Sequence, residues 1–343
     1  MWIHSTVKSL TVTLPPNGVT IGNPHVKMSE FVAEMVNLCP DLVDLRLWVA
    51  EDTAKPIGGL RSLRTVDLIG RDITAILFEL ANLPAVEKLI IHFPSSLPSQ
   101  WPQWIITPFP KLQTLHLGAS YPGASTFLHT LAMGGSRLKE LEITENSRQG
   151  DLGMVTRAAG EHRYLERLRI HSYGNTRISL RPLEHTFPCS SLTSLTLYVK
   201  GDILMVDEEL VILGIGLPGI IHIRLQSQGS TRLTLRALSI AIMSWPYLET
   251  LSLKINGSGT VPPEKHTAPH RHLQILQLTD SGGPTEIMKA AWFIAGLSDV
   301  DGFQLESYEN RIWDLVKELL PELRRARREA RTGTQRNRIS ENC

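Results

Sequence analysis

One pattern of apolar and polar positions recurs along the chain: an apolar residue, two polar residues, a second apolar residue, one polar residue and a third apolar residue. A clear copy runs from Leu112 through Leu115 to Leu117. The first apolar position of the copies falls at Val7, Leu42, Leu63, Val86, Leu112, Leu138, Leu165, Leu192, Ile220, Leu248, Leu273 and Val300. From residue 42 to residue 300 the ten intervals cover 258 residues, a mean of 25.8 per copy. Such regular spacing predicts a stacked repeat architecture.

Each copy predicts a β-strand, because its second and third apolar residues are two positions apart. Leu115 and Leu117 would point into the core, whereas Thr114 and His116 would lie on the opposite face. Apolar residues at helical spacing follow several strands and predict helices that begin near Ser29, Asp72, Ser125, Thr234 and Thr285, the last one closed by Gly296. The segments 94–108, 172–188 and 255–269 are rich in Pro, Gly, Ser and polar residues, and we expect them to be irregular.

The position three residues before each first apolar residue also has a recurring character. It is apolar in most copies and predicts a buried position just before each strand, as at Cys39, Phe109, Cys189 and Trp245. His162 and His270 occupy the same position, so we interpret them as partly buried structural histidines. Cys189 is interpreted as a core thiol, not a nucleophile.

The end of the chain predicts a capping helix for the repeat array. Its apolar stripe comprises Ile312, Leu315, Val316, Leu319, Leu320 and Leu323. Pro321 would kink this helix, and arginines become frequent from Arg324 onward. We therefore expect a repeat domain over 1–308, the capping helix over 309–330, and a basic tail without stable structure over 331–343.

The polar positions of the strands form the surface that the core leaves exposed. The middle positions are Thr11, Arg46, Asp67, Ile90, His116, Glu142, Arg169, Thr196, Arg224, Ser252, Gln277 and Gln304. From this face, expected to be concave, we select candidate partner-binding residues: Arg46, Trp48, Asp67, His116, Glu140, Glu142, Arg167, Arg169, His171, Tyr198, His222 and Arg224. Arginine and aromatic residues dominate protein interfaces, but opposite charges on neighbouring strands also form salt-bridge ladders. The ladder is the simpler interpretation of any single residue, and binding is the better interpretation of the whole face.

Few features point to catalysis. The run Gly214–Gly219 has the GxGxxG spacing of dinucleotide sites, but it precedes a strand and we interpret it as a turn. His266, His270 and His272 lack an accompanying Cys or carboxylate cluster, so no metal is expected. The chain has no GxSxG, phosphate-loop or HExxH motif. We expect no catalytic residue, no cofactor and no small-molecule substrate.

Composition and net charge narrow the classes of partner and the cellular compartments that we expect for this protein. The formal net charge is +1, which argues against a chain-wide field that attracts nucleic acid or membranes. Three distant cysteines, Cys39, Cys189 and Cys343, form no disulfide framework and indicate a reducing compartment. Neither a signal peptide nor a run of about 18 apolar residues is found. We expect a cytoplasmic or nuclear monomer without a membrane partner.

The phrases at Phe109 and Trp245, aromatic-Pro-x-Leu-x-x-Leu-x-Leu, and the segment beginning Trp313-Asp-Leu-Val resemble the ribonuclease-inhibitor-like leucine-rich-repeat region of fungal F-box proteins. The resemblance covers about residues 5–330. It implies a right-handed α/β horseshoe of about 11–12 repeats that recognises the substrates of a ubiquitin ligase. The N-terminal helical F-box of that family is not recognisable in the sequence. Leu14-Pro15 is the only short stretch that is similar to its beginning. The alternative is an RNA- or nucleus-associated protein acting through its basic C-terminal tail, although a solvated helix end explains the same arginines.

Overall fold

The chain forms two compact units in the computed structural model. The first contains Met1–Gly174 and His185–Leu192, and the second contains Asn175–Glu184 and Thr193–Cys343. The structure describes residues 7–12, 34, 36–48, 57–70, 73–92, 94, 97–98, 100, 102–103, 105–145, 151–262, 269–279, 281–308 and 310–341, with the backbone alone at 308 and 331–341. Most of the helix predicted to begin at Ser29 lies outside these residues, as does His266.

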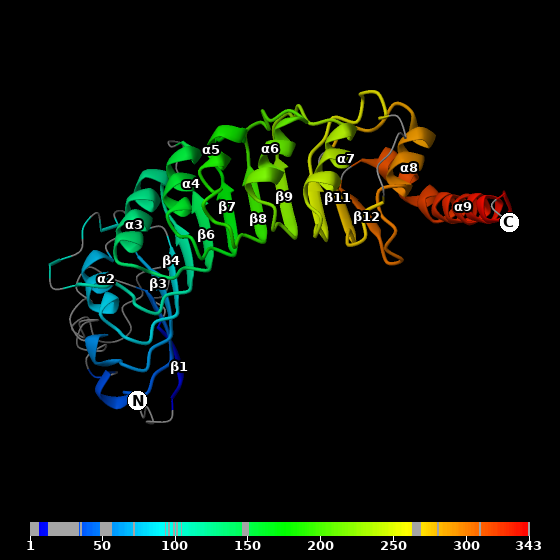
Figure 1. The fold of residues 1–343 in the computed structure, drawn as a ribbon. Helices are drawn as coiled ribbons and strands as arrows, with labels where there is room; N and C mark the ends of the chain where they lie inside the picture. The colour runs from blue at the N-terminus through cyan, green and yellow to red at the C-terminus, as the bar shows by residue number, and fades with distance from the viewer. Residues whose placement is uncertain are drawn as a thin grey trace. The chain divides into compact units, whose positions relative to one another are not determined.

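The first unit is built on a parallel sheet whose strands follow one another in chain order (Figure 1). The strands are β1 (Ser9–Val12), β2 (Asp44–Trp48), β3 (Thr65–Ile69), β4 (Lys88–His92), β5 (Thr114–Gly118), β6 (Glu140–Glu145) and β7 (Arg167–Ser172). Leu89, Leu115, Leu141 and Leu168 are register partners on consecutive strands, and all four are buried. The predicted apolar column is confirmed in this unit.

Helices cover one face of this sheet and leave the other open (Figure 1). They are the 3-10 turn η1 (Ile57–Gly59), α2 (Thr74–Ala81), α3 (Tyr121–Met133) and α4 (Leu152–Gly160). Ser120 caps α3 by accepting a hydrogen bond from the Gly123 amide at 3.4 Å. Asp151 caps α4 in the same way, with the Gly153 amide at 2.9 Å. Their apolar faces, for example Phe127 and Leu131 of α3, are buried.

The second unit repeats this plan. Its strands are β8 (Ser194–Val199), β9 (His222–Ser227), β10 (Thr250–Leu253), β11 (Ile275–Thr279) and β12 (Gln304–Tyr308), again parallel and in chain order. Its helices are α5 (Leu180–Glu184), α6 (Glu209–Gly216), α7 (Leu235–Ser244), α8 (Ile287–Ala295) and α9 (Arg311–Glu341). The buried register partners are Leu195, Ile223, Leu251, Leu276 and Leu305.

Both units are therefore α/β, with a parallel sheet made by a repeated strand-and-helix plan, as the sequence predicted. The right hand of the connections and the number of repeats stay predictions. No described helix combines the length and the apolar character that crossing a membrane requires.

Two predictions about helices need correction. α3 begins at Tyr121, four residues before Ser125, because Ser120 and Pro122 form its first turn. The hydroxyl of Ser125 instead donates to the Met154 carbonyl at 3.1 Å. The segment 172–188, predicted to be irregular, contains α5. Thr234 was correctly placed, since its hydroxyl caps α7 by accepting from the Arg236 amide at 3.2 Å.

The last strand is shifted from its predicted register. Glu306, not Gln304, pairs with Gln277, and Gln304 pairs with Ile275. The bridge between His270 and Ser298 locates the cause. From Ser298 to Leu305 the chain uses one residue more than from His270 to Leu276, and the additional residue lies in the turn around 301–302.

The terminal helix differs from its prediction in length and in orientation. Its backbone stays helical to Glu341, beyond the predicted end at residue 330. Trp313, Val316 and Leu320 are buried, whereas Ile312 and Leu315 of the predicted stripe are exposed. The indole of Trp313, which a count of leucines ignores, sets the buried face, and α9 packs against α8.

The predicted pre-strand positions are confirmed as structural. The ring of His270 lies 2.9 Å from the Trp245 carbonyl through Nε2 and accepts from the Leu273 amide through Nδ1 at 3.0 Å. Burial lowers the pKa of His270 and of His162, which keeps both rings neutral. Burial raises the pKa of the Cys189 thiol to about 11, as expected for a core cysteine.

The GxGxxG run at Gly214–Gly219 includes the end of α6. A Cβ on Gly214 would lie 2.4 Å from the Cβ of Ser244.

Candidate functional site

The open sheet face of each unit carries the selected residues. Along each strand, buried apolar residues alternate with these more exposed side chains, which point away from the helices. The first unit holds Arg46, Trp48, Asp67, His116, Glu140, Glu142, Arg167, Arg169 and His171, and the second holds Tyr198, His222 and Arg224. The predicted register is therefore correct for all of them.

In the first unit the selected charges neutralise one another across neighbouring strands. The ion pairs, with their N–O distances, are Arg46–Asp67 (3.1 Å), Arg167–Glu140 (3.1 Å) and Arg169–Glu142 (3.8 Å). His92, which the sequence analysis did not select, lies 3.1 Å from the second oxygen of Asp67. The three arginine side chains are about half exposed, so each pair contributes only about 0.2–1 kcal/mol. The ladder interpretation thus describes this part of the face.

His116 lies beside the two ion pairs of β6 and β7. Together they line a shallow depression formed by His116, Glu140, Glu142, Arg167 and Arg169. Partial burial lowers the pKa of His116 below its ordinary value, and the nearby Glu142 carboxylate opposes this effect only in part. At neutral pH the depression therefore presents a neutral imidazole and two compensated ion pairs.

The remaining candidates of the first unit are far apart. Trp48 is on β2 and His171 is on β7, five strands away. At about 4.8 Å per strand, that is a separation of about 24 Å. Trp48 is 40% exposed, and a partner that contacts both Trp48 and His171 would have to extend across several strands.

The second unit differs because its open-face arginine is uncompensated. Arg224 has Thr196 and Ser252 as its register partners on β8 and β10, and neither is charged. No described residue forms an ion pair or a hydrogen bond with the guanidinium group of Arg224. His222 is exposed on the same strand, two residues away. The hydroxyl of Tyr198 accepts a hydrogen bond from the Gln228 amide at 2.6 Å, which fixes the ring.

The open-face side chains of β10, the strand next to Arg224, are short. Thr250 and Ser252 are buried although they belong to the open face. Their register partners are the longer side chains of His222 and Arg224 on β9 and of Ile275 and Gln277 on β11. These neighbours close over β10, and Gln226 donates to the Ser252 hydroxyl at 3.1 Å. A partner would therefore meet one unpaired cation among uncharged side chains.

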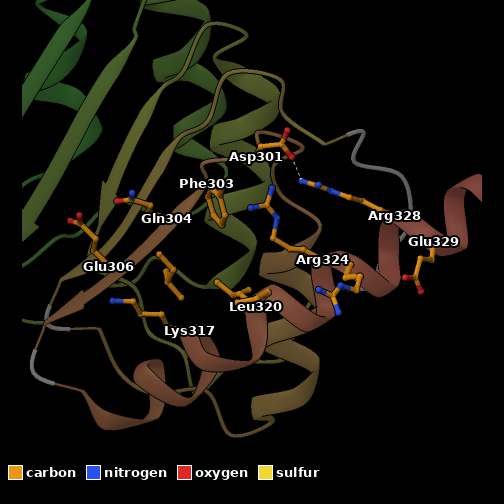
Figure 2. Close-up of a pocket in the computed structure, with 12 residues that line it drawn as sticks. Asp301, Phe303, Gln304, Glu306, Lys317, Leu320, Arg324, Arg328 and Glu329 are labelled. Atoms are coloured by element: carbon orange, nitrogen blue, oxygen red, sulfur yellow. Dashed lines mark ion pairs between the residues drawn. The ribbon is translucent and has the colours of Figure 1, made fainter.

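The open face of the second unit ends at a cleft of about 680 Å³ between β12 and α9 (Figure 2). This size is within the roughly 300–1,000 Å³ typical of ligand sites. Its walls are Phe303, which directly precedes β12, Gln304 and Glu306 of β12, and Lys317, Leu320, Pro321 and Arg325 among the residues of α9. Gln277 donates to Glu306 at 2.6 Å, so the exposed row of the sheet continues into the cleft.

Three arginines of the basic run hold α9 in place. Arg324 donates to the carbonyls of Ser298 and Val300 and lies 5.2 Å from the Phe303 ring centroid. Arg327 lies 4.5 Å from the ring centroid of Trp292 on α8. Arg328 forms an ion pair of 2.6 Å with Asp301, visible in Figure 2. These side chains are engaged within the unit rather than displayed for an RNA.

Sequence reasoning missed His92, Lys317 and Arg325. His92 occupies an open-face strand position, so the repeat alignment could have identified it. Lys317 and Arg325 line the cleft only because of how α9 packs, which no repeat pattern encodes. In the part of the chain that the structure describes, no cluster of three or more His, Cys, Asp or Glu residues could hold a metal ion.

The chain matches no protein-family model and no curated protein. The two open faces and the cleft are therefore the features of the molecule that bear on its function.

Proposed function

We propose that the protein is a non-catalytic binding scaffold whose partner is another protein, held on the open face of the second unit. This role resembles that of the substrate-recognition region of an F-box/leucine-rich-repeat ubiquitin-ligase adaptor. The chain would act as a monomer in the cytoplasm or the nucleus, without a cofactor.

One observation carries the proposal: Arg224, on the open face of β9, has no ion-pair or hydrogen-bond partner among the described residues. Ordered solvent-facing rows of side chains suit a macromolecular partner, because such a partner can contact several strands at once. An arginine without an internal counter-charge keeps its five donors for that partner. In protein complexes such arginines are often the residues whose loss costs most binding energy.

The chemistry of the face also suggests which partner segment would fit. A carboxylate of the partner would form a bidentate pair with Arg224. An extended segment could then follow the uncharged row past Gln277 to the cleft beside α9, where Lys317 and Arg325 line the wall. We therefore expect an acidic, extended segment of a protein.

The test is quantitative affinity capture from an extract of cells that express the protein. Proteins held by the wild-type chain should be depleted at least tenfold on Arg224→Glu, because a central arginine contributes about 2 kcal/mol or more. A matched control exchanges the charges of an internal pair, with Arg169→Glu and Glu142→Arg together. It should retain the captured proteins, because the ion pair re-forms.

Equal capture by Arg224→Glu, or equal loss on the exchanged-pair control, would contradict the proposal. The RNA alternative predicts a different result: capture would depend on RNA and would disappear on nuclease treatment or on deletion of residues 331–343.

A further inference from the structure

Exposed apolar and basic side chains lie on one edge of the first unit, at the end of α3 and in the segments that lead into β5, β6 and β7. Ile106 is 88% exposed and Met133 is 78% exposed, unusually high values for large apolar residues. We call this set the basic–apolar ridge, made of Ile106, Lys111, Met133, Arg137, Arg163 and Tyr164, all of them exposed.

Contacts between consecutive turns bring the ridge residues side by side. Gly134, next to Met133, packs so closely on Pro108 that a Cβ on the glycine would lie 2.5 Å from the proline ring. The Arg137 guanidinium lies 5.9 Å from the centroid of the Tyr164 ring. Because equivalent turns stack at the repeat spacing, the six side chains form one continuous strip.

The backbone beneath the ridge is held by hydrogen bonds. Phe109 and Gly135 adopt positive φ, at 51° and 74°, and turn the chain toward the next strand. The Phe109 amide donates to the Ala81 carbonyl at 2.8 Å, and the Leu112 amide donates to the Phe109 carbonyl at 3.0 Å. Ile106 therefore lies just before a hydrogen-bonded turn, and Met133 is the last residue of α3.

The ridge is basic without internal compensation. Among the described residues, none forms an ion pair with Lys111, Arg137 or Arg163. The flanking carboxylates are already engaged, Glu161 with His129 at 2.8 Å and Glu166 with Lys139 at 3.2 Å. The strip therefore combines three cations that have no ion-pair partner among the described residues with three exposed apolar or aromatic side chains.

We propose that the basic–apolar ridge docks the protein on an anionic lipid surface. Cations gain from anionic headgroups, while projecting aliphatic side chains enter the boundary between headgroups and acyl chains. Tyrosine suits the same boundary, since its ring is apolar and its hydroxyl is polar. A phosphate polymer such as RNA would use the cations but would gain nothing from Ile106 and Met133.

No membrane partner is expected from the sequence, because the net charge of the whole chain is only +1 and no continuous apolar run is long enough to span a bilayer. The ridge residues are spread over three repeats, and folding alone assembles them. The inference is independent of the proposed protein-binding face, which lies on the strands of the second unit.

The experiment is co-sedimentation of the full chain with phosphatidylcholine vesicles, with and without phosphatidylserine, at low and near-physiological salt. Binding should require phosphatidylserine and weaken with salt. Replacing the three cations together (Lys111→Gln, Arg137→Gln, Arg163→Gln) should lower the partition coefficient on the order of 100-fold. Replacing Ile106 and Met133 with Ser should also reduce binding while leaving the charge unchanged.

A charge-matched control removes three exposed arginines elsewhere: Arg157→Gln, Arg181→Gln and Arg232→Gln. This control should bind as the wild type does, and circular dichroism should show that all variants are folded. Absence of binding to phosphatidylserine vesicles at low salt, or equal loss on the control, would overturn the proposal. Binding of a single-stranded RNA probe that the cation variant loses and the Ile106/Met133 variant retains would assign the ridge to nucleic acid instead.

Discussion

The open faces of the two units share one architecture but treat charge differently. On the first, the arginines at 46, 167 and 169 each pair with a carboxylate on the neighbouring strand. On the second, Arg224 stands between Thr196 and Ser252 without a counter-charge. Charged side chains on a repeat surface therefore have two roles. Those compensated by register partners hold the surface together, and an uncompensated one remains available to a partner.

The comparison of the two open faces requires that the strands beneath them are held by equivalent rows of buried apolar register partners in both units. Leu141→Ala in the first unit and Leu251→Ala in the second should each lower the free energy of unfolding by about 2–5 kcal/mol, because both leucines are fully buried register partners. Urea unfolding followed by circular dichroism measures the loss. Thr114→Ala, on the open face of β5, is a control that should change stability by less than about 0.5 kcal/mol. A loss below about 1 kcal/mol in one unit only would mean that the two columns are not equivalent.

The two buried pre-strand histidines, one in each unit, should make the stability of both units depend on pH. Both pKa values are lowered by burial, so the folded chain keeps His162 and His270 neutral while the unfolded chain protonates them near 6.5. The unfolded state then binds more protons, and stability is present above pH 6.5 and is lost as pH falls below it. Each histidine should add at most about 1.4 kcal/mol per pH unit to the slope.

Unfolding curves for His162→Gln and His270→Gln between neutral and mildly acidic pH measure these contributions. Each variant should be less stable than the wild type at neutral pH and should show a shallower slope. His171→Gln, on the open face, is the control for histidine content. An unchanged slope in either pre-strand variant would show that its ring is not held neutral.

The smallest expected effect concerns the ion pairs. A double-mutant cycle with Glu142→Gln and Arg169→Gln should give a coupling energy of only about 0.2–1 kcal/mol, because the pair is largely solvent-exposed. Arg224→Gln should change stability by less than about 0.5 kcal/mol, since no internal partner is lost. Destabilisation by Arg224→Gln that exceeds the loss on Arg169→Gln would reverse the roles assigned to the two faces.

The sequence predicted the strands well because their signal is local and repeated. The alternation at Leu115 and Leu117, combined with a spacing near 26 residues, determines both the strand and the face of each side chain. The pattern therefore places Arg46, Glu142 and Arg224 on the open face, where the structure has them. It failed for β12, where one additional residue in the preceding turn shifts the register and no compositional signal marks it.

Features that depend on packing between elements were not predictable. The pairing of Arg169 with Glu142 is an exception, because the repeat alignment already places these two residues on neighbouring strands and predicts the ladder. Arg324 and Arg327 looked like solvated residues of a basic tail, but α9 places them against backbone carbonyls and the Trp292 ring. The ridge likewise brings together residues from three repeats, which a scan for continuous runs cannot detect.

Site-specific photo-crosslinking in cells tests most directly whether the second open face is the partner surface. A photoreactive residue would replace Thr196 or Gln277 on that face, with Thr114 on the first open face and Ile215 on the helix side as matched positions. The account predicts covalent adducts with the same protein from Thr196 and Gln277, and none with it from Thr114 or Ile215. Adducts from Ile215 or Thr114, with none from the two second-unit positions, would contradict it.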